Sequence, residues 1–258
     1  MSENDRVQSY FYDFHIHTCL SPCGDEDMTP GNIILMAKLK GLDVIAITDH
    51  NTCRNCEAAM KQGERQGIIV IPGMELTTKE EVHVLFLFSS LSKAMEFDSY
   101  VYQHLIKVKN VPDFFGRQLL MDEEDQVIGE ENMLLIQATD IPFSSLAALE
   151  KRYHGLMIPA HIEKGSNSLL SNLGFIPKES AFCVAEWTGI QGRKILEKEN
   201  PYLKSCRLIR DSDAHALGMI SEAEHMIEAL GNSREAILEA LLIPEYKEER
   251  KDGDENSY

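Results

Sequence analysis

The alternation of short apolar runs with amphipathic stretches is the feature that most constrains how these 258 residues fold. The predicted helices cover residues 30–40, 56–66 and 234–242. The predicted strands cover residues 10–16, 44–47, 68–71, 82–88, 134–138, 156–158, 182–185 and 207–209. Repeated alternation of strands and helices is typical of a parallel α/β barrel or open sheet.

Residues 89–155 depart from this rhythm. They hold a predicted helix near 93–108 and then a hairpin, in which 118–121 and 126–128 flank a turn at 122–125. We interpret the region as an insertion packed over one end of the barrel; ordinary barrel elements with a long loop are the alternative. We expect one domain over residues 1–243, a possible insertion at about 89–155, and a charged, flexible tail over 244–258.

The net charge of −17 argues against a broad binding surface for duplex nucleic acid. The longest apolar runs, such as residues 82–88, are too short to span a bilayer. The first eight residues lack the cationic start and apolar stretch of a signal peptide. We therefore expect a cytoplasmic protein with no membrane partner and no duplex nucleic acid partner.

Nearly every predicted strand ends in a residue that can bind a metal ion. These residues are His15, His17, Asp49, His50, Glu75, His83, His161, Glu186, Asp213 and His215. In a parallel barrel the carboxyl ends of the strands converge on one face. Each residue alone has an ordinary packing explanation. Five histidines and at least two carboxylates buried together without metal, however, would leave many polar groups unsatisfied.

Mixed imidazole and carboxylate ligation suits zinc, manganese or iron. About eight ligands are too many for one catalytic ion, so the pattern indicates two or three divalent ions. Two ions ~3.5–4 Å apart can bridge a hydroxide and hold a phosphate. The sequence therefore predicts a metal-dependent phosphoesterase acting on a phosphate monoester or a nucleotide-type phosphoester. The alternative is a non-catalytic or regulatory metal-binding module.

An ordered series of motifs resembles the PHP (polymerase and histidinol phosphatase) superfamily. The motifs are Phe14-His15-Ile16-His17-Thr18, Ile47-Thr48-Asp49-His50-Asn51, Pro72-Gly73-Met74-Glu75, Val82-His83-Val84-Leu85, Pro159-Ala160-His161 and Asp211-Ser212-Asp213-Ala214-His215. The resemblance implies a distorted (β/α)7 TIM-like barrel with a trinuclear metal site and, in the absence of a polymerase body, the free-standing phosphatase branch. It places the metal ligands at His15, His17, His50, Glu75, His83, His161, Asp213 and His215.

The chain departs from the family pattern after Ser21, where an Asp or His ligand commonly follows. Cys23 stands nearest to that spacing, and Asp25 is the other candidate. The catalytic candidates are Asp49, expected to orient a neighbouring imidazole, with His83 and His215. A protonated imidazole or a metal-bound water would protonate the leaving oxygen, and the sequence leaves that choice open.

Two further sets of residues have competing interpretations. Cys19, Cys23, Cys53 and Cys56 have a possible role as a separate four-thiolate zinc site, although reduced, partly buried thiols fit their spacing better. Lys164 and Arg117 are candidates for contacting a substrate phosphate, with solvated surface charge as the alternative. The expected partner is a small phosphorylated substrate or a nucleotide.

Overall fold

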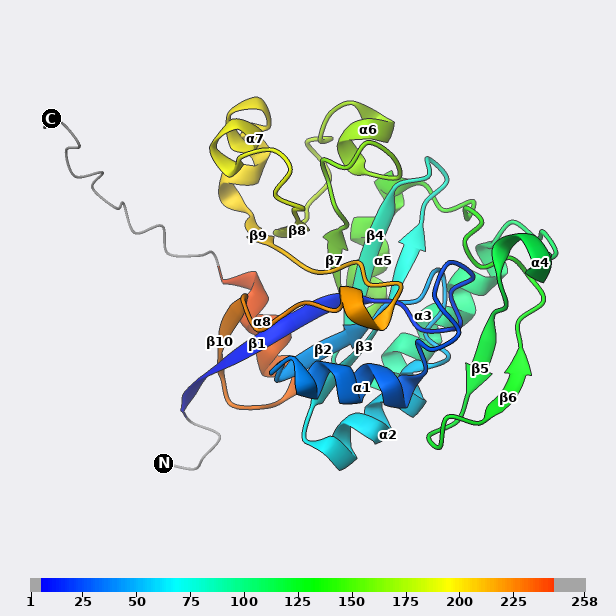
Figure 1. The fold of residues 1–258 in the computed structure, drawn as a ribbon. Coiled ribbons are helices and arrows are strands. Elements are labelled where there is room, and N and C mark those ends of the chain that lie inside the picture. Colours follow the sequence, from blue (N-terminus) through cyan, green and yellow to red (C-terminus); the bar gives the residue numbers. More distant parts are fainter. Residues whose placement is uncertain (1–5, 244–258) are drawn as a thin grey trace, which may run out of the picture.

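The structure, a computed structural model, describes residues 6–243. At its centre is a six-stranded sheet in the order β10-β1-β2-β3-β4-β7 (Figure 1). Its strands are β1 (Val7–Ile16), β2 (Val44–Ile47), β3 (Ile69–Thr77), β4 (His83–Phe88), β7 (Gly155–Pro159) and β10 (Met226–Leu230). Two smaller pairs are formed by β5 (Leu119–Met121) with β6 (Val127–Glu130), and by β8 (Val184–Glu186) with β9 (Arg207–Ile209).

The helices are α1 (Pro30–Leu39), α2 (Cys56–Gln66), α3 (Leu91–His104), α4 (Pro112–Phe115), α5 (Leu146–Tyr153), α6 (Leu169–Leu173), α7 (Arg193–Glu199) and α8 (Arg234–Leu242). Local chemistry explains where α1 begins and where α2 ends. The Thr29 side chain caps α1 by accepting a hydrogen bond from the Asn32 backbone. Gly67 ends α2 in the left-handed conformation, at φ 77°. Within residues 6–243, every helix is too short or too polar to traverse a lipid bilayer.

The strand directions confirm a mixed α/β fold but not a closed barrel of seven parallel strands. β1, β2 and β3 are parallel, whereas β4 is antiparallel to both β3 and β7. Residues 78–82 join β3 to β4 and are too few for the crossover that parallel strands need. In the sequence Pro72-Gly73 resembles a turn after the predicted strand 68–71, but β3 continues through it. A Cβ at Gly73 would lie 2.7 Å from the Phe86 carbonyl oxygen, so the neighbouring backbone occupies that space.

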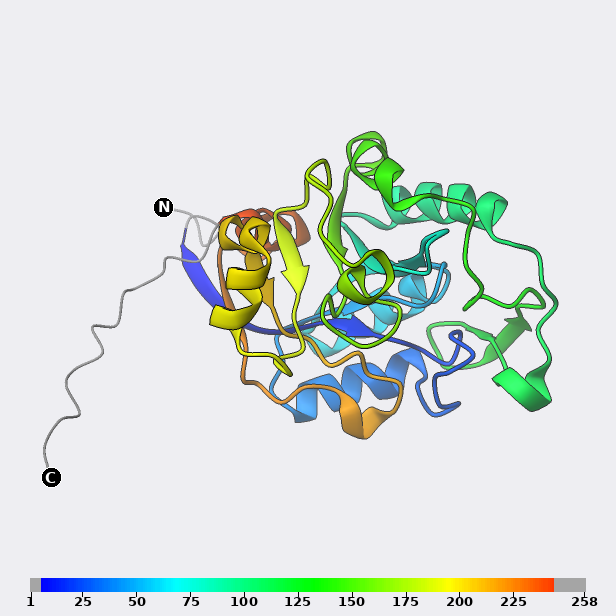
Figure 2. The same cartoon turned by 90° about the horizontal axis from the view of Figure 1, so that it is seen from above.

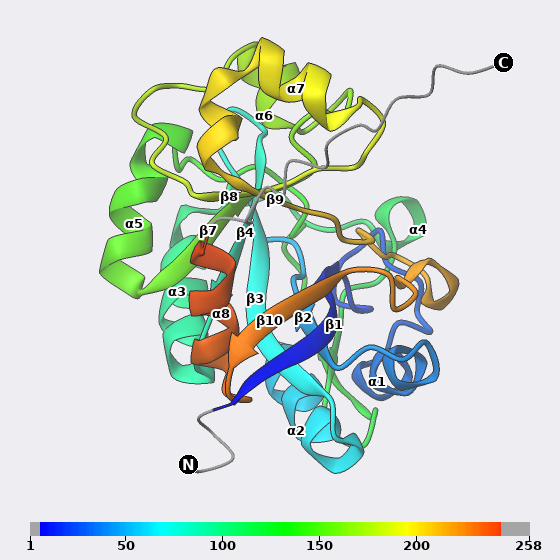
Figure 3. The same ribbon diagram turned by 90° about the vertical axis from the view of Figure 1, so that its left-hand side faces the viewer.

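The sheet buries apolar side chains on both faces. Its outer face packs against α1, α2, α3 and α5, through residues such as Ile45 and Phe86. Its inner face, which includes Phe14 and Leu85, is covered by α8 (Figure 3). Next to these apolar side chains, the same inner face carries Glu75 and His83. The apolar layer therefore forms the floor of the polar site.

A register shift in β1 directs two histidines to the site. The pairing of β1 with β2 is irregular between Asp13 and Ile16. Regular alternation would place Phe14 and Ile16 on one face, but Phe14 lies in the inner cluster and Ile16 in the outer one. Such an irregularity re-aims side chains, and here His15 and His17 both point into the site.

Residues 89–155 contain two kinds of structure. α3 and α5 join the outer helical layer, whereas the predicted hairpin forms as β5–β6 and stands apart from the large sheet (Figures 1 and 2). The hairpin is tied to the loop after His17 by a hydrogen bond from the Leu119 amide to the Cys19 carbonyl.

The strand predicted over residues 134–138 is wrong: this stretch is irregular and is flanked by isolated bridges. The tail 244–258 lies outside the described residues.

Candidate metal centre

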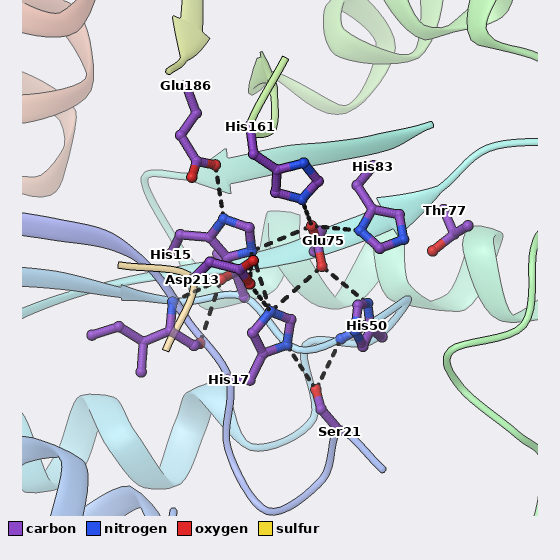
Figure 4. Close-up of polar contacts among 12 residues, drawn as sticks. His15, His17, Ser21, His50, Glu75, Thr77, His83, His161, Glu186 and Asp213 are labelled. Carbon is purple, nitrogen blue, oxygen red and sulfur yellow. Dashed lines mark hydrogen bonds and ion pairs between the residues drawn. The ribbon is translucent and has the colours of Figure 1, made fainter. Parts of the chain in front are cut away.

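The Glu75 carboxylate lies at the centre of the site and is surrounded by imidazoles (Figure 4). Five ring nitrogens lie 2.9–3.4 Å from its two oxygens, and they belong to His15, His17, His50, His83 and His161. Asp213 completes the ring, with Oδ1 3.4 Å from Nε2 of both His15 and His17. All but Asp213 are buried. These side chains therefore do converge, although Glu75 lies inside β3 and His83 lies at the amino end of the antiparallel strand β4, not at the carboxyl end of a parallel strand.

Three overlapping groups of donor atoms are close enough together to share an ion. The groups are His17, His50 and His215; His15, His17 and Asp213; and His50, Glu75 and His83. Within each group the donor atoms lie within 4.8 Å of one another. Because His17 and His50 each belong to two groups, neighbouring ions would lie side by side, as in dinuclear and trinuclear hydrolase sites.

Hydrogen bonds among the side chains do not satisfy this cluster. His50 Nδ1, Glu75 Oε2 and His161 Nδ1 are buried and have no hydrogen-bond partner. His50 Nδ1 and Glu75 Oε2 lie only 3.0 Å apart without forming a hydrogen bond. His15 Nε2 also faces His17 Nε2 at 3.2 Å. Buried polar atoms without partners are rare in folded proteins. Divalent cations would satisfy those of His50 and Glu75, which belong to the donor groups, whereas His161 belongs to none of these groups. The donor set therefore fits bound metal ions.

The electrostatics of the cluster favour negative carboxylates. Burial by itself raises the pKa of Glu75, but the imidazoles of His83, His15 and His50 hold it well below its usual range. Burial by itself lowers the pKa of His15, yet the carboxylates of Glu186, Glu75 and Asp213 raise it well above its usual value. A cation that binds here therefore meets carboxylates already ionised, but it competes with a proton on His15.

Asp49 acts on the cluster through hydroxyl groups rather than by direct contact. Its carboxylate is buried and accepts hydrogen bonds from the Thr18 amide, the Thr18 hydroxyl and the Ser21 hydroxyl, each at 2.7 Å. Ser21 Oγ lies 3.0 Å from His17 Nδ1. Asp49 is therefore placed to orient His17 through Ser21, in a relay that the sequence pattern does not reveal.

Glu186 contacts the other histidine of β1. Its Oε2 lies 2.8 Å from His15 Nδ1, and both side chains are buried. A carboxylate behind a ligating imidazole fixes the orientation of the ring and makes it a better ligand. In the sequence, Glu186 is a candidate because it directly follows the predicted strand 182–185. Its contact with His15 could not be predicted from that position.

Two of the predicted ligands have strained backbones. His161 has φ 31° and Asp213 has φ 50°. Positive φ is uncommon for residues other than glycine and persists where the surroundings enforce it, often at functional sites. The Lys164 side chain, 46% exposed, places its ammonium nitrogen 2.9 Å from Asp213 Oδ2.

The remaining candidates lie at different distances from the centre. Cys23 and Lys164 line the cavity of about 160 Å³ over the cluster, whereas Asp25 and Arg117 do not. Neither Cys23 nor Asp25 belongs to the three donor groups. Partial removal from water, with the carboxylates of Glu75 and Asp213, raises the pKa of the Cys23 thiol to about 12. Arg117 instead lies beside Glu130, with Nε 3.4 Å from Oε1.

The four cysteines considered as a zinc site do not come together. Cys19 packs with Leu119 and Met121, whereas Cys53 and Cys56 lie in the main core. In residues 6–243 no cysteine is part of a group of potential metal ligands. These cysteines are therefore separate thiols.

Three relatives share part of this sequence. An uncharacterized protein of Methanocaldococcus jannaschii is 39% identical over 92 residues, 32% of this chain and 54% of that protein. The 5'-3' exoribonuclease Rnm of Salmonella typhimurium is 33% identical over 33% of this chain and 29% of its own length. The phosphoribosyl 1,2-cyclic phosphate 1,2-diphosphodiesterase of Eggerthella lenta is 31% identical over 29% of each. The chain thus spans about half or less of each relative.

A solved structure overturns the expectation about duplex nucleic acid. Endonuclease Q in complex with a 27-mer duplex carrying an abasic lesion has a TM-score of 0.67 and 18% identity. The match covers 92% of this chain and 56% of that one. Excluding duplex nucleic acid because of net charge was wrong, since this fold accommodates a duplex and a sequence relative is an exoribonuclease. Net charge averages over the whole surface, and bound cations dominate the field at a metal centre.

One protein-family model matches the region of the chain that contains most of the candidate site. The sequence model of the PHP domain matches residues 13–162, which include all the predicted ligands from His15 to His161. This span is more than half of the chain. The chain therefore belongs to the PHP domain family.

Proposed function

We propose that the chain is a metal-dependent phosphoesterase that hydrolyses phosphodiesters of nucleotides. The observation that carries the proposal is the Glu75 carboxylate within reach of five imidazoles, with buried ring and carboxylate atoms left unpartnered. The named relatives support a diester, since one is an exoribonuclease and another a diphosphodiesterase.

Eight side chains would hold two or three zinc, manganese or iron ions: His15, His17, His50, Glu75, His83, His161, Asp213 and His215. Bound divalent ions supply Lewis-acid activation of the phosphoryl group and a nucleophilic water at neutral pH. Cys23 is the closer of the two candidates for a further ligand, because it lines the cavity and Asp25 does not.

The other side chains of the site position the reacting groups. Asp49 and Glu186 keep His17 and His15 in place and touch no substrate. Lys164 can turn from Asp213 to a phosphate oxygen, because its side chain is half-exposed and lines the cavity. His83 and His215 both line the cavity. Both are counted among the ligands, and His215 Nδ1 already faces the Asp213 carbonyl oxygen at 2.8 Å, so neither imidazole is assigned the proton given to the leaving oxygen.

The test compares bis-p-nitrophenyl phosphate with p-nitrophenyl phosphate after reconstitution with each metal. We expect turnover that depends on the metal, is lost with EDTA and favours the diester. Glu75→Gln should abolish turnover, whereas Glu228→Gln, on the exposed side of β10, should not change it. A protein shown by elemental analysis to hold metal, yet without turnover with any ion, would instead be a metal-binding module.

A further inference from the structure

The cavity over the metal centre is too small for a whole nucleotide. Its volume is about 160 Å³ and the candidate ligands themselves line it, whereas pockets for small organic ligands measure roughly 300–1,000 Å³. The cavity therefore accepts the phosphate group, and the rest of a substrate lies beyond its rim.

A larger cavity opens on the other side of Lys164. We call it the α6–α7 groove; its volume is about 460 Å³, and Lys164 lines both cavities. Its other polar lining residues are Glu163, Ser171, Gln191, Glu199 and Asn200. The two carboxylates already accept hydrogen bonds, Glu163 from the Thr188 hydroxyl and Glu199 from the Gln191 side-chain amide. Figures 1 and 3 show α6 and α7 side by side beyond β8 and β9. A chain that leaves the metal centre past Lys164 enters this groove, where hydroxyl and amide groups match sugar and base edges.

The segment that carries α7 is positively charged in a strongly acidic protein, although the one α7 residue that lines the groove itself is Glu199. Residues 187–210 connect Glu186 to Asp211 and have a net charge of +4, although the whole chain has −17. Their basic residues are Arg193, Lys194, Lys198, Lys204, Arg207 and Arg210. Concentrated positive charge beside a phosphate-binding site is the electrostatic feature expected of a surface for a polyanion.

Four of these cations are available for a ligand. Lys194, Lys198, Lys204 and Arg210 are exposed and form no ion pair with other described residues. Lys194 and Lys198 are one turn apart, and so they share a face of α7. Some cations elsewhere on the surface, such as Arg65, are paired with acidic neighbours. Lys79, Lys109 and Lys151 are also exposed, but they lie apart on separate segments of the chain. Unpaired lysines gain more from contacting phosphates, because no internal ion pair has to break.

We propose that the α6–α7 groove and the basic residues of α7 bind one strand of a nucleic acid, leading its scissile phosphate past Lys164 to the metal centre. The proposal rests on the proposed function and names its substrate class. A small phosphorylated metabolite would need neither a second groove beside the metal centre nor several unpaired cations beyond that groove. A strand carries a phosphate at each nucleotide and uses both.

The test measures binding of a fluorescein-labelled oligothymidylate to metal-free protein in EDTA, which separates binding from hydrolysis. The variant K194Q/K198Q/K204Q removes three lysines of this surface. The matched control K79Q/K109Q/K151Q removes the same charge from exposed lysines elsewhere. Trp187 is a second reporter, because it is the single tryptophan and its Nε1 donates to the Gln191 carbonyl in the groove wall.

We expect the groove variant to bind at least about tenfold more weakly than the control variant at low salt. Its slope of log affinity against log salt should be less steep by about two, since each phosphate contact in a single strand contributes about 0.7. Equal affinities of the two variants would overturn the proposal. Equally effective competition by a polyglutamate peptide would also overturn it, in favour of an acidic protein partner.

Turnover of bis-p-nitrophenyl phosphate separates this proposal from the proposed function. The groove variant should turn over this small diester at the wild-type rate, because the three lysines lie outside the metal centre. If even the wild-type protein fails to hydrolyse it, the proposed function fails, while the oligonucleotide comparison still decides what the groove binds.

Discussion

Replacing Glu186 by Gln removes a negative charge from behind His15 but keeps a hydrogen-bond acceptor there. The Oε2–Nδ1 contact of 2.8 Å lies between two buried side chains. Hydrogen bonds to a charged group contribute about 1.5–3 kcal/mol and neutral ones about 0.5–1.5 kcal/mol. The difference of about 1.4 kcal/mol corresponds to roughly tenfold in metal affinity. Glu186→Ala leaves His15 Nδ1 buried and unpartnered, and should approach a hundredfold loss.

The effect should depend on pH in a defined direction. Glu186 helps to raise the pKa of His15, so at low pH the same carboxylate retains a proton that the ion must displace. The substitution relieves this competition. The ratio of wild-type to Glu186→Gln affinity should therefore be larger near about pH 9 than near about pH 6.5.

Competition for zinc with a fluorescent chelator measures these affinities, and thermal unfolding of the metal-free proteins checks that the fold is intact. Glu228→Gln is the matched control, because it removes a carboxylate from an exposed position on β10. The reasoning is refuted if Glu186→Gln and Glu186→Ala both bind zinc within about twofold of wild type at both pH values.

Three further predictions concern other parts of the site. Lys164→Ala should lower kcat/KM for a diester by about one to two orders of magnitude, with Lys178→Ala as control; an unchanged rate would exclude a phosphate contact. The pKa of the Cys23 thiol is raised to about 12, so this thiol should react slowly with iodoacetamide. In metal-free protein that carries Cys183→Ser, its rate at about pH 8 should be some two to three orders of magnitude below that of free cysteine. A rate comparable to that of free cysteine would contradict the raised pKa. Asn51 makes three hydrogen bonds, from its Nδ2 to the carbonyls of Leu135 and Gln137 and from the Thr77 amide to its Oδ1, and all but the one to Gln137 are buried. Asn51→Ala should therefore lower the free energy of unfolding by about 2–4 kcal/mol in urea, and a loss below about 0.5 kcal/mol would show that water replaces these bonds.

The convergence of the site could be predicted because it depends on chain position. The residues that follow a strand lie at the edge of the sheet whatever the rest of the fold does. The sequence alone therefore predicts that His50, His161 and Asp213 lie at this edge. The direction of β4 was not found, because alternation along a strand is the same in parallel and antiparallel sheets. Only the shortness of the connection 78–82 shows that β4 runs antiparallel to β3. Because Pro72-Gly73 resembles a turn, the sequence makes β3 look shorter, and the connection longer, than they are.

Contacts between distant side chains were beyond the reach of the sequence pattern. Arg117 and Lys164 were equivalent candidates, yet Lys164 lines the cavity and Arg117 lies beside Glu130. Likewise, the Ser21 relay from Asp49 to His17 depends on a loop conformation that no periodicity reports. The expectation about duplex nucleic acid failed because a net charge is an average over the whole chain and reports no local feature, such as the net charge of +4 on residues 187–210.

The site joins the first strand to a segment almost two hundred residues later in the chain. β1 meets the segment after β9 through the bridge between Ile16 and Ala214 and through the hydrogen bond from the Phe14 amide to Asp211. An ion held by His15, His17 and Asp213 would therefore close a loop of almost two hundred residues, in the manner of a removable cross-link. Ligands that bind only the folded state stabilise it by about 2.7 kcal/mol at a hundred times their Kd. Metal supply would then set the lifetime of the whole fold as well as the activity of its site.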